Sequence, residues 1–143
     1  MTSSLENLCG SAGPLIAEAP EAQEFAGLCA AAEESLADAR NADNRLGTRF
    51  LLAYTAAHAM CLAALRHAGY RARHRYIVFQ SLPHTLGLGP DVWRVLSLAH
   101  DKRNLAEYEG HVEVSEQLVT EMLVAVETVS ARVKALPPIA RNR

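Results

Sequence analysis

A long apolar repeat in the middle of the chain constrains the fold more than any other feature. Residues 44–67 place apolar side chains at helical spacing for about six turns, and few charges interrupt them. A helix with so little polar surface has to be covered by other elements. We therefore predict that it is the central, most buried helix. Its apolar positions are Leu46, Phe50, Ala53, Tyr54, Ala57, Met60, Cys61, Ala64 and Leu65.

Three further stretches are predicted to be long helices, at residues 20–39, at residues 90–111 and after Ser115. A proline opens each of the first two, where its missing N–H is tolerated. Gly110 suits the end of the second, and Ser115 is a good N-cap for the third. Aromatic residues make up only 6% of the chain, and alanine and leucine dominate, which favours helices over sheets.

The remaining segments are short. The apolar run at residues 76–82 could be a strand by pattern, but no second strand-like run exists to pair with it, so a short helix ended by Pro83 is expected. The fold class is therefore all-α, an antiparallel bundle of four to five helices. We expect a flexible N-terminal arm at 1–19, the bundle domain at 20–136 and a disordered tail at 137–143.

Charge is distributed unevenly along the chain. The net charge is −2, with −7 in residues 1–44 and +5 in residues 45–111. The middle of the chain is thus the part that can meet an anion, while the modest total excludes a protein built mainly to coat nucleic acid.

The cysteines and the hydropathy pattern bear on location. Cys9, Cys29 and Cys61 lie far apart with no CxxC pair, so neither a disulfide scaffold nor a zinc site is predicted. No signal-peptide pattern opens the chain, and no apolar run approaches the roughly 20 residues of a membrane helix. These features predict a cytoplasmic protein with no membrane contact.

One charged residue interrupts the apolar face of the helix at 90–111. Arg103 lies four residues after Ala99 and three before Ala106, both on that face. A buried arginine is costly unless it is paired, so this position needs a partner or a ligand. The polar residues on the same arc are His100, Asn104 and Glu107, with Tyr108 on its flank.

A basic segment follows the central helix. It contains three arginines and a histidine between two tyrosines, with a fourth arginine just before them, a combination that suits single-stranded RNA, although a solvated loop would look the same. Its candidate RNA-binding residues are Arg66, Arg71, Arg73 and Arg75. His58, on the apolar face of the central helix, is predicted to be a core histidine.

Several of these strings resemble the HEPN superfamily, in particular a bacterial branch of it. Arg103-Asn104-x-x-Glu107-Tyr108-Glu109-Gly110 resembles its "RN…EYEG" signature. The Ala-Tyr-x-Ala-Ala-His string at 53–58 and the Ala-Leu-x-x-x-Gly-Tyr-Arg string at 64–71 are also similar to it. The resemblance covers residues 20–135 and implies a homodimeric four- or five-helix bundle whose motif helices meet across the two-fold axis.

The family's activity follows from the same resemblance. Many members are metal-independent RNA endonucleases, often in toxin–antitoxin or defence systems, and others bind RNA, nucleotides or partner proteins. Their motif is an Arg, usually a polar residue, and a His four to six residues after the Arg. Here Tyr108 stands near the expected position of the His, and the next histidine downstream is His111. The implied catalytic candidates are Arg103, Asn104, Glu107, Tyr108 and His111.

These residues leave three functions open. The first is an RNA-associated HEPN-like protein, either a metal-independent ribonuclease or a degenerate one. The second is a non-catalytic regulatory bundle that binds a nucleotidyltransferase-type antitoxin. The third is a small-molecule nucleotide binder. Arg103 suits phosphate binding, and His suits acid–base chemistry near neutral pH, whereas Tyr is a poor base. No metal or cofactor is expected.

Overall fold

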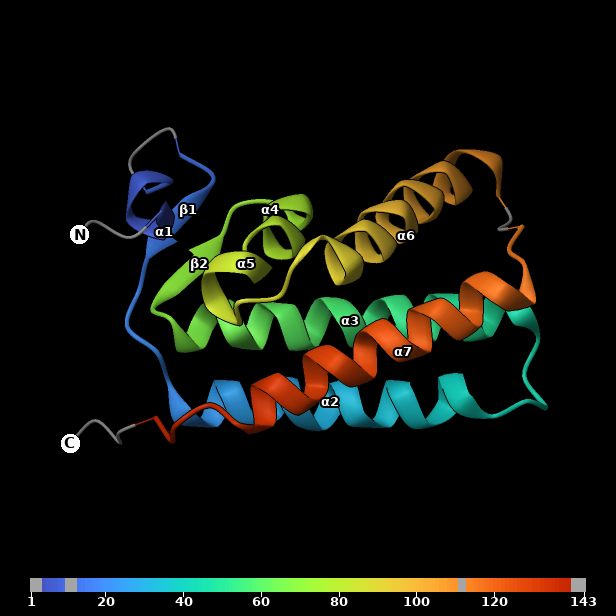
Figure 1. Ribbon diagram of the computed structural model, residues 1–143, viewed down its shortest axis with the longest axis horizontal. Helices are drawn as coiled ribbons and strands as arrows, with labels where there is room; N and C mark the ends of the chain where they lie inside the picture. The colour runs from blue at the N-terminus through green and yellow to red at the C-terminus, as the bar shows by residue number, and fades with distance from the viewer. Residues whose placement is uncertain (1–3, 10–12, 111–112, 140–143) are drawn as a thin grey trace.

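The computed structural model describes residues 4–9, 13–110 and 113–139. Its body consists of long helices that run alternately up and down (Figure 1). These are α2 (Ala22–Arg40), α3 (Leu46–His67), α6 (Pro90–Glu109) and α7 (Glu116–Lys134). Shorter elements are α1 (Ser4–Asn7), β1 (Leu15–Ala17), β2 (Tyr70–Ala72), α4 (Arg75–Gln80) and α5 (Leu82–Thr85). The predicted helical bundle is therefore confirmed.

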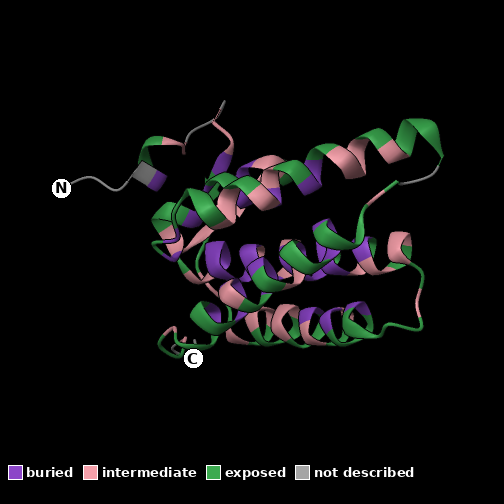
Figure 2. Ribbon diagram, turned by 45° about the vertical axis from the view of Figure 1, so that its right-hand side comes forward, coloured by how far each residue is buried: buried purple, intermediate pink, exposed green. Residues whose placement is uncertain are grey.

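Helix α3 is the centre of the bundle, as its apolar repeat predicts. Phe50, Met60 and Leu65 are fully buried, and α3 packs against α2, α7, α6 and α4. Figure 2 shows the buried residues concentrated along this helix. By length and composition alone α3 could cross a membrane, contrary to our expectation that no run is long enough. Most of the helix is buried inside the bundle, which accounts for its apolar composition.

The ends of the helices confirm the predicted caps. Ser115 Oγ accepts a hydrogen bond from the Leu118 N–H at 3.0 Å and opens α7. Gly110 adopts φ +79°, in the left-handed region, and donates its N–H to Ala106 O at 2.8 Å. The run at 76–82 is helical as expected, but Pro83 lies in the first turn of α5 instead of ending a helix.

A small sheet is the main departure from the all-α prediction. β1 pairs antiparallel with β2, with Ile16 opposite Arg71. Leu15 and Leu5 are buried, so the described part of the predicted flexible arm at 1–19 is packed onto the bundle. The sequence did not predict this sheet, because strands of three residues are too short to show an alternating pattern. The basic residues of β2 are also typical of a loop. Residues 140–143 of the predicted tail lie outside the described part of the chain.

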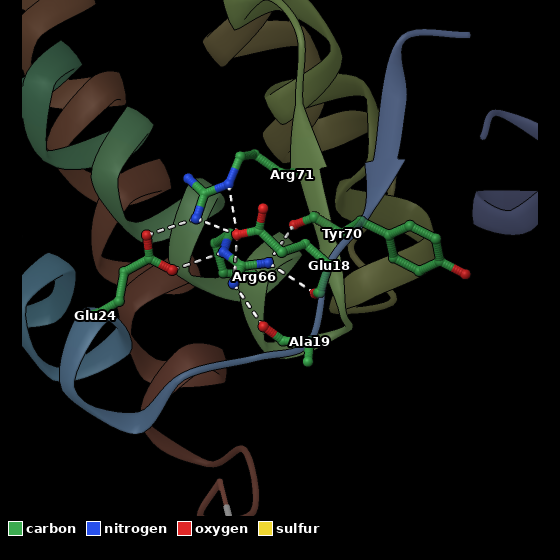
Figure 3. Close-up of polar contacts among 6 residues, drawn as sticks. All are labelled: Glu18, Ala19, Glu24, Arg66, Tyr70 and Arg71. Atoms are coloured by element: carbon green, nitrogen blue, oxygen red, sulfur yellow. Dashed lines mark hydrogen bonds and ion pairs between the residues drawn. The ribbon is translucent and has the colours of Figure 1, made fainter. Parts of the chain in front are cut away.

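Arg66 ties this sheet to the bundle (Figure 3). Its side chain is only 2% exposed, yet every guanidinium nitrogen donates a hydrogen bond. Nε donates to Glu24 Oε1 at 2.7 Å, Nη1 to Glu18 O at 3.0 Å and to Tyr70 O at 3.3 Å, and Nη2 to Ala19 O at 2.8 Å. The end of α3 thereby fixes the segment between β1 and α2.

Arg71 closes the same cluster from the β2 side. Its Nη2 lies 2.6 Å from Glu18 Oε2 and 2.9 Å from Glu24 Oε2. The two guanidiniums lower the pKa of both carboxyl groups, in each case chiefly through hydrogen bonds. Since the cations and anions of the cluster are matched in number, it presents little net charge to a ligand.

Replacing Arg66 by Met tests how much this cluster contributes to the stability of the fold. The substitution keeps the apolar stem but leaves three carbonyl groups and Glu24 without their donor, so we expect a loss of about 3 kcal/mol or more in the free energy of unfolding. The matched control is Arg40→Met, which removes an exposed ion pair with Glu127 and should cost at most about 1 kcal/mol. Urea denaturation measures both, and equal losses would contradict the structural role of Arg66.

Candidate functional site

Arg103 lies beside a pocket of about 330 Å³. The pocket is enclosed by α3, α6, the start of α4 and, through Leu28, α2. Its polar wall includes Tyr54, His58, Arg75 and Arg103, and its apolar wall includes Leu28 and Leu51. The sequence-predicted arginine therefore faces a hollow in its own chain.

The position of Arg103 along α6 explains why the helix tolerates it. Leu96 and Ala99 are buried, but from residue 101 onward no described residue of α6 is buried. Figure 1 shows the C-terminal half of α6 leaning away from α3. Arg103 is 23% exposed and so lies at the edge of the core, not within it.

Two neighbours in the chain contact the Arg103 guanidinium. Nη2 lies 2.8 Å from Glu107 Oε1, and Cζ lies 5.6 Å from the centroid of the Tyr54 ring. Glu107 is 59% exposed, so this ion pair is weak and an anion can displace it at small cost. The predicted partner of Arg103 is thus present, and the guanidinium still lines the pocket.

Behind the pocket wall a buried histidine links α6 to α3. Asn104 Nδ2 lies 3.1 Å from His100 Nε2, and His100 Nδ1 lies 3.1 Å from Tyr54 Oη. With the amide nitrogen facing Nε2, that atom accepts, Nδ1 carries the proton, and it donates to Tyr54. Burial lowers the His100 pKa, which keeps the ring neutral in this arrangement. Asn104 therefore positions Tyr54 through His100 instead of facing the pocket.

The Tyr54 hydroxyl is held in its protonated form. Burial raises its pKa, while a hydrogen bond with Arg75 and the charges of Arg75 and Arg103 act in the opposite direction. The two guanidiniums thus approach the same ring from different helices. Sequence reasoning placed Tyr54 in the core and did not identify it as a site residue.

His58 is the second site residue that the sequence did not reveal. It was predicted to be a core histidine, but it is only partly buried and lines the pocket one helical turn from Tyr54. Burial lowers its pKa to about 4, and the positive charges of Arg75 and Arg103 act in the same direction. The only sequence signal was a pair of polar rings at i and i+4 on an otherwise apolar face.

A second pocket, of about 270 Å³, adjoins the first. It shares His58 and Arg75 with the first pocket, and Arg71, Arg73 and His74 also line it. Of the four predicted RNA-binding residues, Arg71, Arg73 and Arg75 therefore meet at this pocket. Arg66 does not, because its guanidinium is buried in the cluster with Glu18 and Glu24.

The four described residues among the five predicted catalytic ones do not meet at one point. Arg103 and Glu107 pair with each other, Asn104 bonds His100, and Tyr108 is 92% exposed and lines neither pocket. His111 lies outside the described residues. Within the described ranges no group of three or more His, Cys, Asp or Glu side chains could hold a metal ion. The residues gathered at the pockets instead form a cationic surface.

The pKa of His58 gives a direct test of this environment. Its folded-state value of about 4 lies below the ordinary value near 6.5, so the unfolded chain takes up this proton more readily. Stability contributed by neutral His58 should therefore be complete above pH 6.5 and fall as the pH drops toward 4. His100, whose pKa is also lowered, acts in the same direction.

The measurement compares the native chain with His58→Gln between pH 7 and pH 5. In this range the carboxyl groups of Glu18 and Glu24 stay ionised because their pKa values are lowered. The native chain should lose stability, and the variant should lose less. An NMR titration that placed the His58 pKa at or above 6.5 would contradict the arrangement of Arg75 and Arg103 around it.

Comparisons with known proteins add no relative. No protein-family model, curated protein or solved structure matches this chain. The likeness to the HEPN superfamily is accordingly carried by the sequence strings alone. A function for the chain has to be argued from the geometry of the two pockets.

Proposed function

We propose that this chain binds single-stranded RNA at the pocket between α3, α4 and α6, as an RNA-associated protein of the HEPN type. The observation that carries the proposal is the convergence of Arg75 and Arg103 on Tyr54 and His58. Among the described residues, those lining the pocket include no carboxylate. Two guanidiniums held this way favour a phosphate group.

The shape of the pocket fits a nucleotide strand as well as its charge does. The side chains of Leu28 and Leu51 offer an apolar surface beside the cations, whereas the Tyr54 ring, 2% exposed, forms the buried back of the pocket. Proteins bind single-stranded RNA through a basic groove that adjoins a surface on which bases can pack. The positive middle of the chain supplies the charge, although the whole protein is slightly acidic.

Binding is better supported than cleavage. Metal-independent cleavage of RNA needs a base, an acid and a cation at one phosphate. Tyr108 and Glu107 do not face the pocket with Arg103, and neutral His58 is the nearest base. Ribonuclease activity is therefore a more specific proposal than RNA binding. RNA cleavage that a chelator does not inhibit would demonstrate it.

The homodimer of the proposal would use the outer face of α6. Leu98 is 47% exposed and Leu105 is 54% exposed, and they lie seven residues apart on the side of α6 away from the core. Large apolar side chains on one exposed face are a common feature of protein contacts. A second α6 on this face would bring two Arg103 pockets into one particle.

Replacing Arg103 by Gln tests the proposed RNA contact. The loss of a charged hydrogen bond to phosphate should weaken binding of a single-stranded RNA about tenfold or more. Fluorescence anisotropy at several salt concentrations should also show the slope of log affinity against log salt falling by about 0.7, the value for one phosphate contact.

The matched control is Arg94→Gln, which removes an exposed arginine from the same helix away from this pocket. Its effect should be less than about twofold, since it removes only distant charge. Circular dichroism confirms that both variants fold. RNA affinity that is absent, or equal in the two variants, would sink the proposal and favour a helical bundle that binds a protein partner.

A further inference from the structure

The two pockets share one wall. His58 and Arg75 line both, so the first pocket, with Tyr54 and Arg103, opens next to the second, with Arg73 and His74. Together they form a two-part cleft over α3, which we call the cationic cleft. Its first part has the apolar wall of Leu28 and Leu51, while the second part carries the basic segment.

The positive charge in the cationic cleft is compensated unequally. Glu107 pairs with Arg103, and Glu18 and Glu24 pair with Arg71, but among the described ion pairs none includes Arg75. None of the described residues that line the cleft is acidic. Besides burial, the positive charges of Arg75 and Arg103 help to keep His58 neutral. Two cations that line one hollow are both attracted to an anion placed between them.

We propose that the cationic cleft recognises a phosphate monoester, with the phosphate between Arg75 and Arg103 beside His58 and the attached nucleoside against Leu28 and Leu51. The choice of RNA as the carrier of this group rests on the proposed function. The same chemistry occurs in a phosphorylated RNA end and in a free nucleoside monophosphate, and the experiment below separates these two sources.

Charge selects a monoester over the internal diester of an RNA strand. A monoester carries about −1.5 to −2 charges at pH 7 and has three terminal oxygens, whereas a diester carries only −1. Two guanidiniums that can each bind in a fork match the larger charge and the extra oxygen. The apolar wall gives the attached nucleoside a place outside the charged part of the cleft.

His58 can take up a proton when the phosphate binds and so add a third positive charge to the site. In the free protein burial disfavours the charged form of His58, and Arg75 from α4 and Arg103 and His100 from α6 act in the same direction. Arg73 and His74 line the adjoining pocket. A bound dianion reverses that field, because an opposite charge within a few ångströms favours the imidazolium. Binding should therefore draw a proton onto His58, and its NMR signals report whether the phosphate is there.

The test uses competition by unlabelled RNA oligonucleotides of one sequence. One carries a 5′-phosphate, one a 3′-phosphate, and one hydroxyl groups at both ends. We expect one phosphorylated form to compete about five- to tenfold better than the hydroxyl form, in line with a charged hydrogen bond. Arg75→Gln should remove this preference, while Arg45→Gln, which removes an exposed arginine at the start of α3, should keep it.

A second arm titrates the protein with a nucleoside 5′-monophosphate and with the matching nucleoside. The monophosphate should raise the His58 pKa from about 4 toward 6.5, and the nucleoside should not. If RNA binds with no preference for a phosphorylated end and the monophosphate leaves His58 unchanged, the inference is overturned while the RNA proposal stands. If the monophosphate shifts His58 but no RNA binds, the inference stands with the free nucleotide as ligand and the RNA proposal fails.

Discussion

The convergence of Arg75 and Arg103 on one pocket is the constraint on which the proposed function depends. Two guanidiniums from different helices approach one buried ring and one histidine, and only Arg103 has a carboxylate partner among the described ion pairs. Folding places them there because the apolar surface of α3 must be covered, and α4 and α6 both pack against it. The apolar requirement of the central helix thus brings two cations to one pocket.

Two arginines of this chain meet the energetic cost of burying a guanidinium in opposite ways. Arg66 is buried, and carboxylates and carbonyl groups surround it, so it stabilises the fold and has no donor left for a ligand. Arg103 lies where α6 leaves the core, with one exposed carboxylate as partner. Both are arginines at apolar positions of a helix, and their surroundings distinguish a guanidinium enclosed by partners from one that lines a pocket.

The sequence predicted the parts of the fold that depend on local pattern. The long helices, the Ser115 cap and the Gly110 end follow from periodicity and backbone preference, and the structure confirms them. The pairing of β1 with β2 could not be predicted, because it joins distant segments of three residues each. For the same reason the site was only partly found: Arg103 and Arg75 stood out as charges, whereas Tyr54 and His58 became site residues only through the approach of α4 and α6.

A double-mutant cycle measures the central claim most directly. RNA affinity is compared for the native chain, for Arg75→Gln, for Arg103→Gln and for the double variant. If both guanidiniums bind one phosphate, the double variant should lose less free energy of binding than the two single losses added together, by about 0.5 kcal/mol or more. Additive losses would mean that the two arginines act on separate groups, and would contradict the shared site.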